Sequence, residues 1–474
     1  MSSTTSRSST PRLAGLAILG LLALVAAIAY RNYLQAHRKP STPPSIAIQA
    51  QPLVEELRKL KQAAIDDPTD AQHRWDLVKF YERNGFAPQA MIQLDVILRM
   101  QPTDEKANLE MASLLLATNQ AKIAEKAYME ITRRNPKSAE GWQGLSASYF
   151  KDKDYLPATH AAEKAYALKP DDPDNKLALA VAELNYALQF NQPEAYAQQF
   201  EQARGLLTEL TKIWPTSGEV YFLLGRTLRV MRRYPDAIPV LRRARELMPT
   251  DADTVTELAR SLSASGDRAT ARKEVEAAIA AKAVNGNLYG IYAQLLQQSA
   301  EPDSEAKTVD ALEHAVALAP HDTGFRERLG SAYLRSNRIE EARKLFEQIA
   351  LADPNRSYPF QQLATIYSRM GQRERSAAAA TQATKMAANE NQLHQIQLLS
   401  AQHPESANLH LILGDRYMDL HIPGPAKDEY TQALKIDPKS TRAKNGLARL
   451  DALKNAKLTP DGQQPPPPVA PGKP

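Results

Sequence analysis

The chain of 474 residues contains no cysteine. This absence excludes disulfide bonds, thiolate zinc sites, a nucleophilic cysteine and a lipid-modified N-terminal cysteine. It leaves the compartment open, because a chain without thiols tolerates oxidising and reducing surroundings alike. Aromatic residues amount to only 6% and glycines number only 19, which argues against a sheet-rich enzyme and favours helices. The net charge of +5 is small for this length, so the molecule as a whole is not a nucleic-acid binder by electrostatics.

Motifs that carry catalytic chemistry are also missing. The sequence contains no HExxH, GxxxxGK(S/T), GxGxxG or GxSxG pattern, and GLSAS at 144–148 lacks the final glycine of the last one. Ser304 and Lys307 match a lactamase-like SxxK fragment without its companion motifs. Pro404 and Pro423 interrupt the helices between four late histidines, so these are not expected to converge on a metal: His394, His403, His410 and His421. We therefore predict no catalytic residue, no cofactor and no metal.

One long apolar run lies near the N-terminus, after a short tail at 1–12. Residues 13–30 are 18 uncharged residues, which at helical rise cover about 27 Å, close to the thickness of a bilayer core. We predict a single-pass signal-anchor helix followed by a Pro-rich linker at 31–51, because Arg31, Arg38 and Lys39 disfavour transfer of that end. The alternative is a cleaved signal peptide, with Ala27-Ile28-Ala29 as the A-x-A site and a secreted product. A buried core helix is a third reading. Flanking charges nearly balance, so they do not decide the side of the membrane; an extracytoplasmic array is slightly favoured.

Beyond residue 51 the prolines recur with a period of 34 residues. The interval separates Pro68, Pro102, Pro136 and Pro170, and it returns from Pro215 to Pro249, from Pro320 to Pro354 and from Pro404 to Pro438. Between the prolines the same residue types come back at fixed offsets. The clearest are a leucine and, four residues later, a tyrosine: Leu77, Leu145, Leu329, Leu363 and Leu413 with Tyr81, Tyr149, Tyr333, Tyr367 and Tyr417.

This template resembles the tetratricopeptide repeat (TPR) family. The stretch 137–170 carries it most fully: Trp142, Leu145, Ser146 and Tyr149 share one face of a first helix, Ala158, Ala162 and Ala165 give a second helix a small surface, and Pro170 ends it. The resemblance implies an all-α superhelix, or α-solenoid, of about ten helix-turn-helix repeats. We expect the repeats to begin near residues 71, 105, 139, 173, 218, 252, 286, 323, 357 and 407.

The array is expected to span 52–457, with a lone helix at 52–66 and a polar cap helix at 441–453. Two repeats are irregular, because the interval from Pro170 to Pro215 is 45 residues and that from Pro354 to Pro404 is 50. These excesses predict insertions in the fourth and ninth repeats. The tail at 458–474 has too little apolar content to fold and should be disordered.

In this family peptide ligands usually contact the concave side through the second, fifth, ninth and twelfth positions of each repeat. The matching positions form an apolar strip of Leu109, Leu116, Phe150, Leu177, Val181 and Leu184, and a basic group of Arg226, Arg229 and Arg260. The apolar strip has a simpler interpretation as core. The other arginines of 226–245 are interpreted as a solvated face, neutralised by Glu219, Glu246 and Glu257. The Lys/Asn clamp of some TPR proteins is missing, since Trp75 and Lys79 stand at its positions.

These features predict a non-catalytic, membrane-tethered scaffold that binds a protein or peptide in its concave groove, with an acidic segment facing the arginines. One alternative is an accessory subunit of an envelope assembly or export machine for polysaccharide, pili or cytochromes. Another is an enzyme whose site lies in the two insertions. Its candidate acid–base groups would be Glu194, Glu201, Glu390, His394 and His403.

Overall fold

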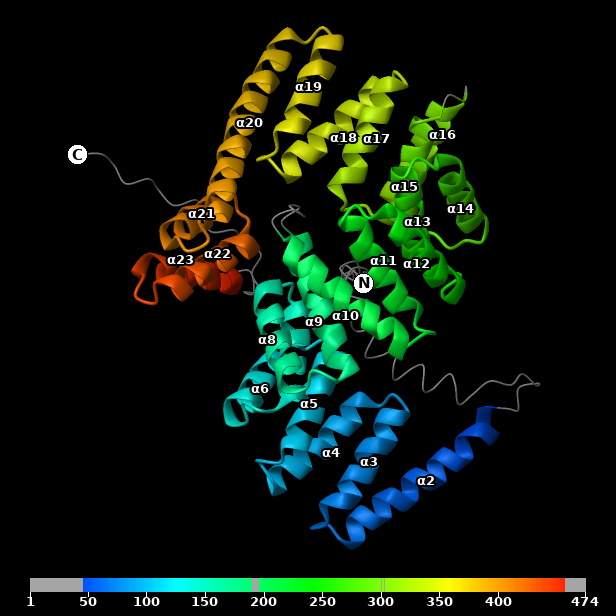
Figure 1. The fold of residues 1–474 in the computed structure, drawn as a ribbon, viewed down its shortest axis with the longest axis vertical. Helices are drawn as coiled ribbons and strands as arrows, with labels where there is room; N and C mark the ends of the chain where they lie inside the picture. Colours follow the sequence, from blue (N-terminus) through cyan, green and yellow to red (C-terminus); the bar gives the residue numbers. More distant parts are fainter. Residues whose placement is uncertain (1–45, 190–195, 300, 302, 457–474) are drawn as a thin grey trace, which may run out of the picture. The chain divides into compact units, whose positions relative to one another are not determined.

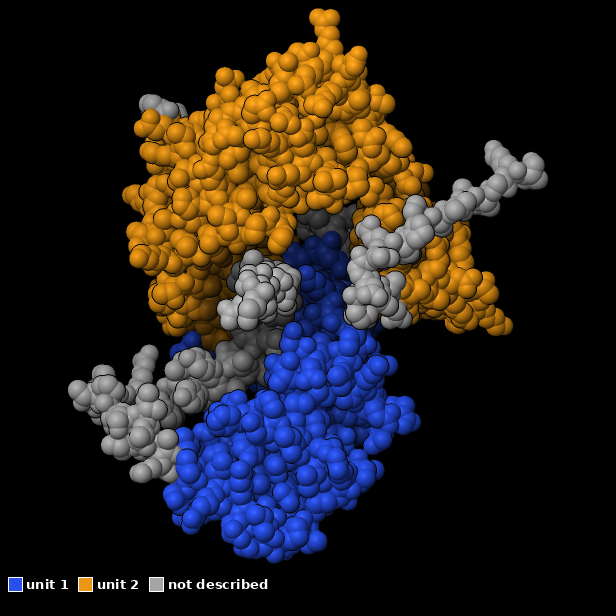
Figure 2. All heavy atoms as spheres, turned by 180° about the vertical axis from the view of Figure 1, so that it is seen from behind, with its two compact units in different colours: residues 1–216 blue, residues 217–474 orange. Residues whose placement is uncertain are grey.

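The computed structural model describes residues 46–189, 196–299, 301 and 303–456. These residues form 22 α-helices, α2 to α23, and no strand (Figure 1). They divide into two compact units at 1–216 and 217–474 (Figure 2), which are treated separately below. The apolar run at 13–30 and the tail at 458–474 lie outside the described ranges. Among the helices within those ranges, none is both long and apolar enough for a membrane span.

Unit 1 consists of a single helix followed by four helix pairs. Its helices are α2 (Ile46–Asp66), α3 (Ala71–Arg83), α4 (Ala87–Met100), α5 (Glu105–Ala117), α6 (Ala121–Arg134), α7 (Ala139–Lys151), α8 (Tyr155–Leu168), α9 (Pro173–Leu188) and α10 (Ala197–Ile213). The expected linker at 31–51 is therefore too long, since α2 begins at Ile46 and contains Pro52. Pro52 lacks the backbone N–H that would bond four residues back, and α2 nevertheless continues through it.

Unit 2 continues with six pairs and a terminal helix. Its helices are α11 (Gly218–Val230), α12 (Tyr234–Leu247), α13 (Ala252–Ala264), α14 (Arg268–Ala280), α15 (Gly286–Gln297), α16 (Ser304–Leu318), α17 (Thr323–Arg335), α18 (Ile339–Ala352), α19 (Ser357–Arg369), α20 (Arg373–Gln402), α21 (Ala407–Asp419), α22 (Pro423–Ile436) and α23 (Thr441–Ala456). We call the odd-numbered members from α3 to α21 the A helices and the even-numbered members from α4 to α22 the B helices.

Short polar residues explain where the A helices begin. In nine of the ten pairs an Asp, Ser or Asn precedes the A helix and accepts a hydrogen bond from a backbone N–H of its first turn: Asp70, Asp104, Ser138, Asp172, Ser217, Asp251, Asn285, Asp322 and Ser406. The exception is α19, where Arg356 provides no side-chain cap. There Glu390 of α20 accepts from Ser357, at 2.9 Å from its backbone N and 2.5 Å from its Oγ.

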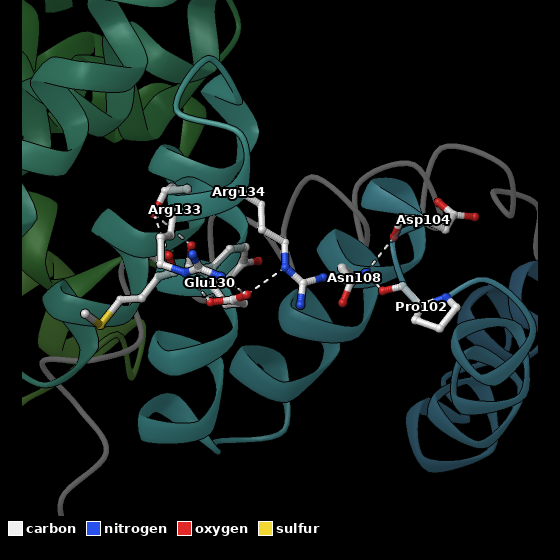
Figure 3. Close-up of polar contacts among 9 residues, drawn as sticks. Pro102, Asp104, Asn108, Glu130, Arg133 and Arg134 are labelled. Atoms are coloured by element: carbon white, nitrogen blue, oxygen red, sulfur yellow. Dashed lines mark hydrogen bonds and ion pairs between the residues drawn. The ribbon is translucent and has the colours of Figure 1, made fainter.

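In some repeats a side-chain hydrogen bond also links the A helix to the proline that precedes it. The fourth residue of three repeats reaches back six positions to the carbonyl of that proline. Trp142 donates to Pro136 at 2.9 Å and Asn108 to Pro102 at 3.2 Å (Figure 3). His410 bonds Pro404 in the same way at 3.1 Å, so this histidine is a structural residue.

Figure 3 also shows Glu130 accepting hydrogen bonds from both Arg133 and Arg134, which lowers the pKa of Glu130 to about 2.

The two long intervals are accommodated differently. The fourth pair has lengthened helices of 16 and 17 residues on either side of 190–195. In the ninth pair, the excess becomes part of one continuous helix, since α20 runs for 30 residues. Leu393 and Ile396 in its second half pack against the core of the tenth pair. The expected separate insertion in the ninth repeat is therefore an extension of a B helix.

Inside three of the ten pairs a large B-helix side chain packs against a glycine of the A helix, which has no Cβ. An added Cβ at Gly330 would lie 2.6 Å from the ring of Phe346, and one at Gly414 would lie 2.7 Å from the ring of Tyr430. Phe346 and Tyr430 are both fully buried. The pairs thus close through contacts that allow no extra volume.

We expect Gly330→Ala to destabilise unit 2 by about 1–3 kcal/mol, because the new methyl group would overlap Phe346. The matched control is Gly205→Ala, also within a helix, where no atom lies within 4 Å of the added Cβ. The control should be neutral or stabilising by up to about 1 kcal/mol, since alanine favours helix over glycine. Urea unfolding followed by circular dichroism checks both variants; equal midpoints for the two would contradict the packing account.

His410 predicts a pH dependence of the last repeats. Its Nδ1 lies 2.6 Å from Oε2 of Glu429, and both side chains are only 12% exposed. The Glu429 carboxylate raises the pKa of His410 above its ordinary 6.5. The pair therefore stabilises the folded state fully below pH 6.5 and progressively less as the pH rises through the folded pKa. We expect Glu429→Gln to lower the free energy of unfolding by about 1–2 kcal/mol at pH 6. The difference should shrink by pH 9 in urea titrations; a constant difference would contradict it.

Candidate partner-binding surface on the A helices

Neighbouring A helices contact one another at some of the junctions in each unit, and we call this row of helices the A-helix wall. Consecutive A helices contact one another in the pairs α5·α7, α7·α9, α11·α13, α13·α15 and α17·α19, whereas consecutive B helices make no comparable contact in the described residues. Polar side chains bridge this wall, as when Asn285 donates to Asp253 at 2.8 Å and Arg356 bonds Glu327. Within each unit the A helices approach one another more closely than the B helices do. The row of helices therefore curves, and the A-helix wall is its inner, concave side.

The predicted apolar strip does not form one exposed surface. Leu109 and Leu116 of α5 are half-buried and pack beside the cluster around Tyr128. Phe150 is half-buried, with its ring 5.5 Å from that of Tyr155. The other three residues, all on α9, are core residues with exposures of 1%, 5% and 0%: Leu177, Val181 and Leu184. Assigning these three to a ligand groove is wrong, because α7, α8 and α10 all pack against α9 and cover them.

The predicted arginines gather around one buried carboxylate. Glu257 of α13 is 7% exposed and pairs with the guanidinium of Arg229 from α11. Its other oxygen lies 3.4 Å from Nη1 of Arg260. Arg226, one turn before Arg229, makes no hydrogen bond or ion pair with any described residue. Glu257 thus pairs with two guanidinium groups, and Arg226 adds a third positive charge near them.

A fourth arginine joins this group from another repeat. Arg328 of α17 donates to the backbone carbonyl of Gly290 in α15 at 2.7 Å. Burial first, and then the positive charge of Arg260, lowers the pKa of Arg328. Burial likewise lowers the pKa of Arg260, and the charges of Arg229 and Arg226 add to this effect against the opposing charge of Glu257. We call these four residues the arginine cluster: Arg226, Arg229, Arg260 and Arg328.

Three of the remaining arginines of 226–245 have local partners on or next to α12. Arg233 bonds Asp236 at 2.8 Å and Arg243 bonds Glu246 at 2.7 Å, while Arg245 donates to the carbonyl of Pro249. Of the acids expected to neutralise this run, Glu219 has no arginine partner in the described residues. Its pKa is raised to about 7 by burial and by Asp251.

Three of the five acid–base candidates of the two long repeats have partners, and a fourth, His394, is exposed on α20. Glu390 caps α19 as described above, and Glu201 pairs with Arg204 at 2.7 Å. His403 faces Glu405 at 3.4 Å on the surface, and Glu194 lies outside the described ranges. His421 occupies a turn with φ of 58°. Across the described ranges, no three His, Asp or Glu side chains come together as metal ligands.

The sequence missed Arg328 because it is not at one of the four ligand-facing template positions. It stands at the sixth position of its repeat, and only the spacing of α17 relative to α15 carries its guanidinium back to the wall. The buried position of Glu257 was also missed, since a carboxylate among solvated residues and one among arginines look the same in a sequence.

Comparisons with known proteins identify the repeats. Two family models described as tetratricopeptide repeat match, one at residues 231–295 and 305–363 and the other at 194–252. Protein O-mannosyl-transferase TMTC1 is similar over part of the chain. The mouse protein is 27% identical over 142 residues and the human protein 25% identical over 161 residues. These segments cover 30% and 34% of this chain but only 15% and 18% of the relatives' lengths.

Solved structures with similar folds include a tetratricopeptide repeat protein from Parabacteroides merdae. It has 11% identity and a TM-score of 0.42, with 59% of this chain and 99% of that chain covered. The human IFIT1 dimer with m7Gppp-AAAA has 14% identity and a TM-score of 0.39, with 88% and 90% covered. With the matched family models and the 22 paired helices, the chain contains tetratricopeptide repeats and folds as an all-helical TPR solenoid.

Proposed function

We propose that this protein is a non-catalytic scaffold that captures a partner protein on the A-helix wall of unit 2. The observation that supports this most directly is the arginine cluster, which brings four guanidinium groups from three A helices together. Only two of them, Arg229 and Arg260, pair with a carboxylate, that of Glu257. The ligand we infer is an extended or helical segment with acidic side chains. Phe222, one turn before Arg226 and half-buried on α11, would offer an apolar contact beside the charges.

The energetic argument rests on like charges held close together. Partial burial and mutual repulsion disfavour the charged forms of Arg260 and Arg328, as their lowered pKa values indicate. Carboxylates of a ligand would relieve this repulsion and form charge-assisted hydrogen bonds with planar guanidinium groups. Binding should therefore be selective for acidic segments and should weaken with salt.

The first test uses a photoreactive residue at the wall. With benzoylphenylalanine in place of Phe222, we expect crosslinks to a defined acidic segment of the partner, identified by mass spectrometry. Arg226→Glu with Arg260→Glu should reduce crosslinking at least tenfold, because two attractive contacts become repulsive. The matched control is Arg242→Glu with Arg243→Glu, which makes the same charge change on the exposed face of α12. Undiminished capture by the A-helix variant at low salt would contradict the proposal.

We further propose that residues 13–30 tether the scaffold to a membrane, on the basis of the length and apolarity of that run. The experiment is protease treatment of sealed vesicles combined with sequencing of the mature N-terminus. We expect the array to sediment with the vesicles and to start upstream of residue 13. An N-terminus at residue 30 with the array in the soluble fraction would replace the tether with a cleaved signal peptide.

A further inference from the structure

A recurrent polar contact joins consecutive repeats at the eleventh position of three A helices, α17, α19 and α21. Tyr333 donates its hydroxyl to Glu313, twenty residues earlier on the preceding B helix, at 2.9 Å. Tyr367 donates to Glu347 at 2.8 Å, again across twenty residues. In the tenth repeat, Gln397 donates to the hydroxyl of Tyr417 at 2.7 Å with the same spacing. The contact places a neutral hydroxyl opposite a polar group of the neighbouring repeat.

The fourth repeat replaces this tyrosine with a carboxyl group. Glu183 of α9 stands at the eleventh position, and the residue twenty positions earlier is Glu163 of α8. Glu183 is 4% exposed, and its Oε2 has no hydrogen-bond partner among the described residues. Glu163 is exposed. The junction between the third and fourth repeats therefore has carboxyl groups at both positions, where the Tyr333, Tyr367 and Tyr417 junctions have a donor and an acceptor.

Among the described residues, no positively charged side chain forms an ion pair with Glu183 or Glu163. Arg338 bonds Glu313 at 3.1 Å and Arg343 bonds Glu347 at 2.7 Å, but Glu163 makes no ion pair among the described residues. Lys164 of α8 is exposed. Several charged side chains on the helices that pack against α9 have their own partners: Lys151 of α7 with the carbonyl of Leu116, Glu140 of α7 with Lys169, Arg204 with Glu201 on α10, and Glu209 of α10 with Lys176. His160 of α8 and Lys212 of α10 are exposed.

We propose that this junction is a pH-sensitive joint, in which ionisation of Glu183 weakens the packing of α9 against α8. When Glu183 is protonated, its side chain is a neutral group in a buried position, as the tyrosine hydroxyl is at the Tyr333 and Tyr367 junctions. When it is ionised, an unpaired charge is buried near the negative charge of Glu163. The joint tightens as the pH falls, and the Tyr333 and Tyr367 junctions do not respond.

The environment of the Glu183 carboxyl group determines the direction of the pH dependence and the pH range in which it occurs. Burial, and then the charge of Glu163, raises the pKa of Glu183 from 4.5 to about 7. The folded junction therefore retains a proton that the opened junction loses, so its stability is greatest below pH 4.5 and falls as the pH rises to about 7. With these two values the opening equilibrium constant should increase about tenfold between pH 6 and pH 8.

Hydrogen–deuterium exchange of the full-length protein tests the joint. Protection factors, corrected for intrinsic exchange, are compared at pH 6 and pH 8 for peptides from α8 and α9. We expect protection there to fall about tenfold in the natural sequence, while peptides from α16 and α17, at the Tyr333 junction, stay constant. This internal comparison removes pH effects common to the whole chain.

Two substitutions of Glu183 test whether its carboxyl group causes the pH dependence. Glu183→Gln keeps the shape without the charge, and Glu183→Tyr restores the residue of the other junctions. Both should abolish the pH dependence of the α8 and α9 peptides, and Glu163→Gln should reduce it. Equal protection at both pH values in the natural sequence, or an unchanged pH response in Glu183→Gln, would overturn the proposal.

Discussion

The structure depends on the burial of a large B-helix side chain against the closest approach of its A helix. Phe346 against Gly330 and Tyr430 against Gly414 illustrate the contact, and Leu241 fills the same place over Gly225. A helix pair alone has too little core to be stable, so each pair also needs its neighbours. Stability is therefore local and repeated, and a single unsuitable residue weakens one junction without changing the architecture.

That locality allows individual template positions to acquire other chemistry. The inner wall of unit 2 exchanges packing residues for Arg226, Arg229 and Arg260, and the surrounding repeats keep the helices in place. Glu183 does the same at a buried position, where a tyrosine would be the structurally simpler choice. In both places a charged side chain is partly or fully buried, which costs free energy. Such residues often occur at functional sites, where a role other than packing determines the residue type.

The periodicity of the sequence predicted most of the fold. The expected first residue of each repeat is also the first residue of its A helix. This agreement arises because the proline and the short polar cap act within a few residues of the helix start. Less was predicted of the candidate site. Leu177, Val181 and Leu184 are at ligand-facing template positions, yet they are buried because the lengthened helices of the fourth pair surround them. Arg328 lies off those positions and still reaches the wall.

By itself, the sequence determined the helical repeat, its period and the first residues of the A helices, since caps, prolines and apolar spacing are local properties of the chain. It also determined which positions carry unusual charge. Only the tertiary structure decided which of those charges meet, as at Glu257, and which apolar residues are covered, as on α9. The physical reason is that electrostatic coupling and burial depend on distances between separate helices, and the packing of neighbouring repeats sets those distances.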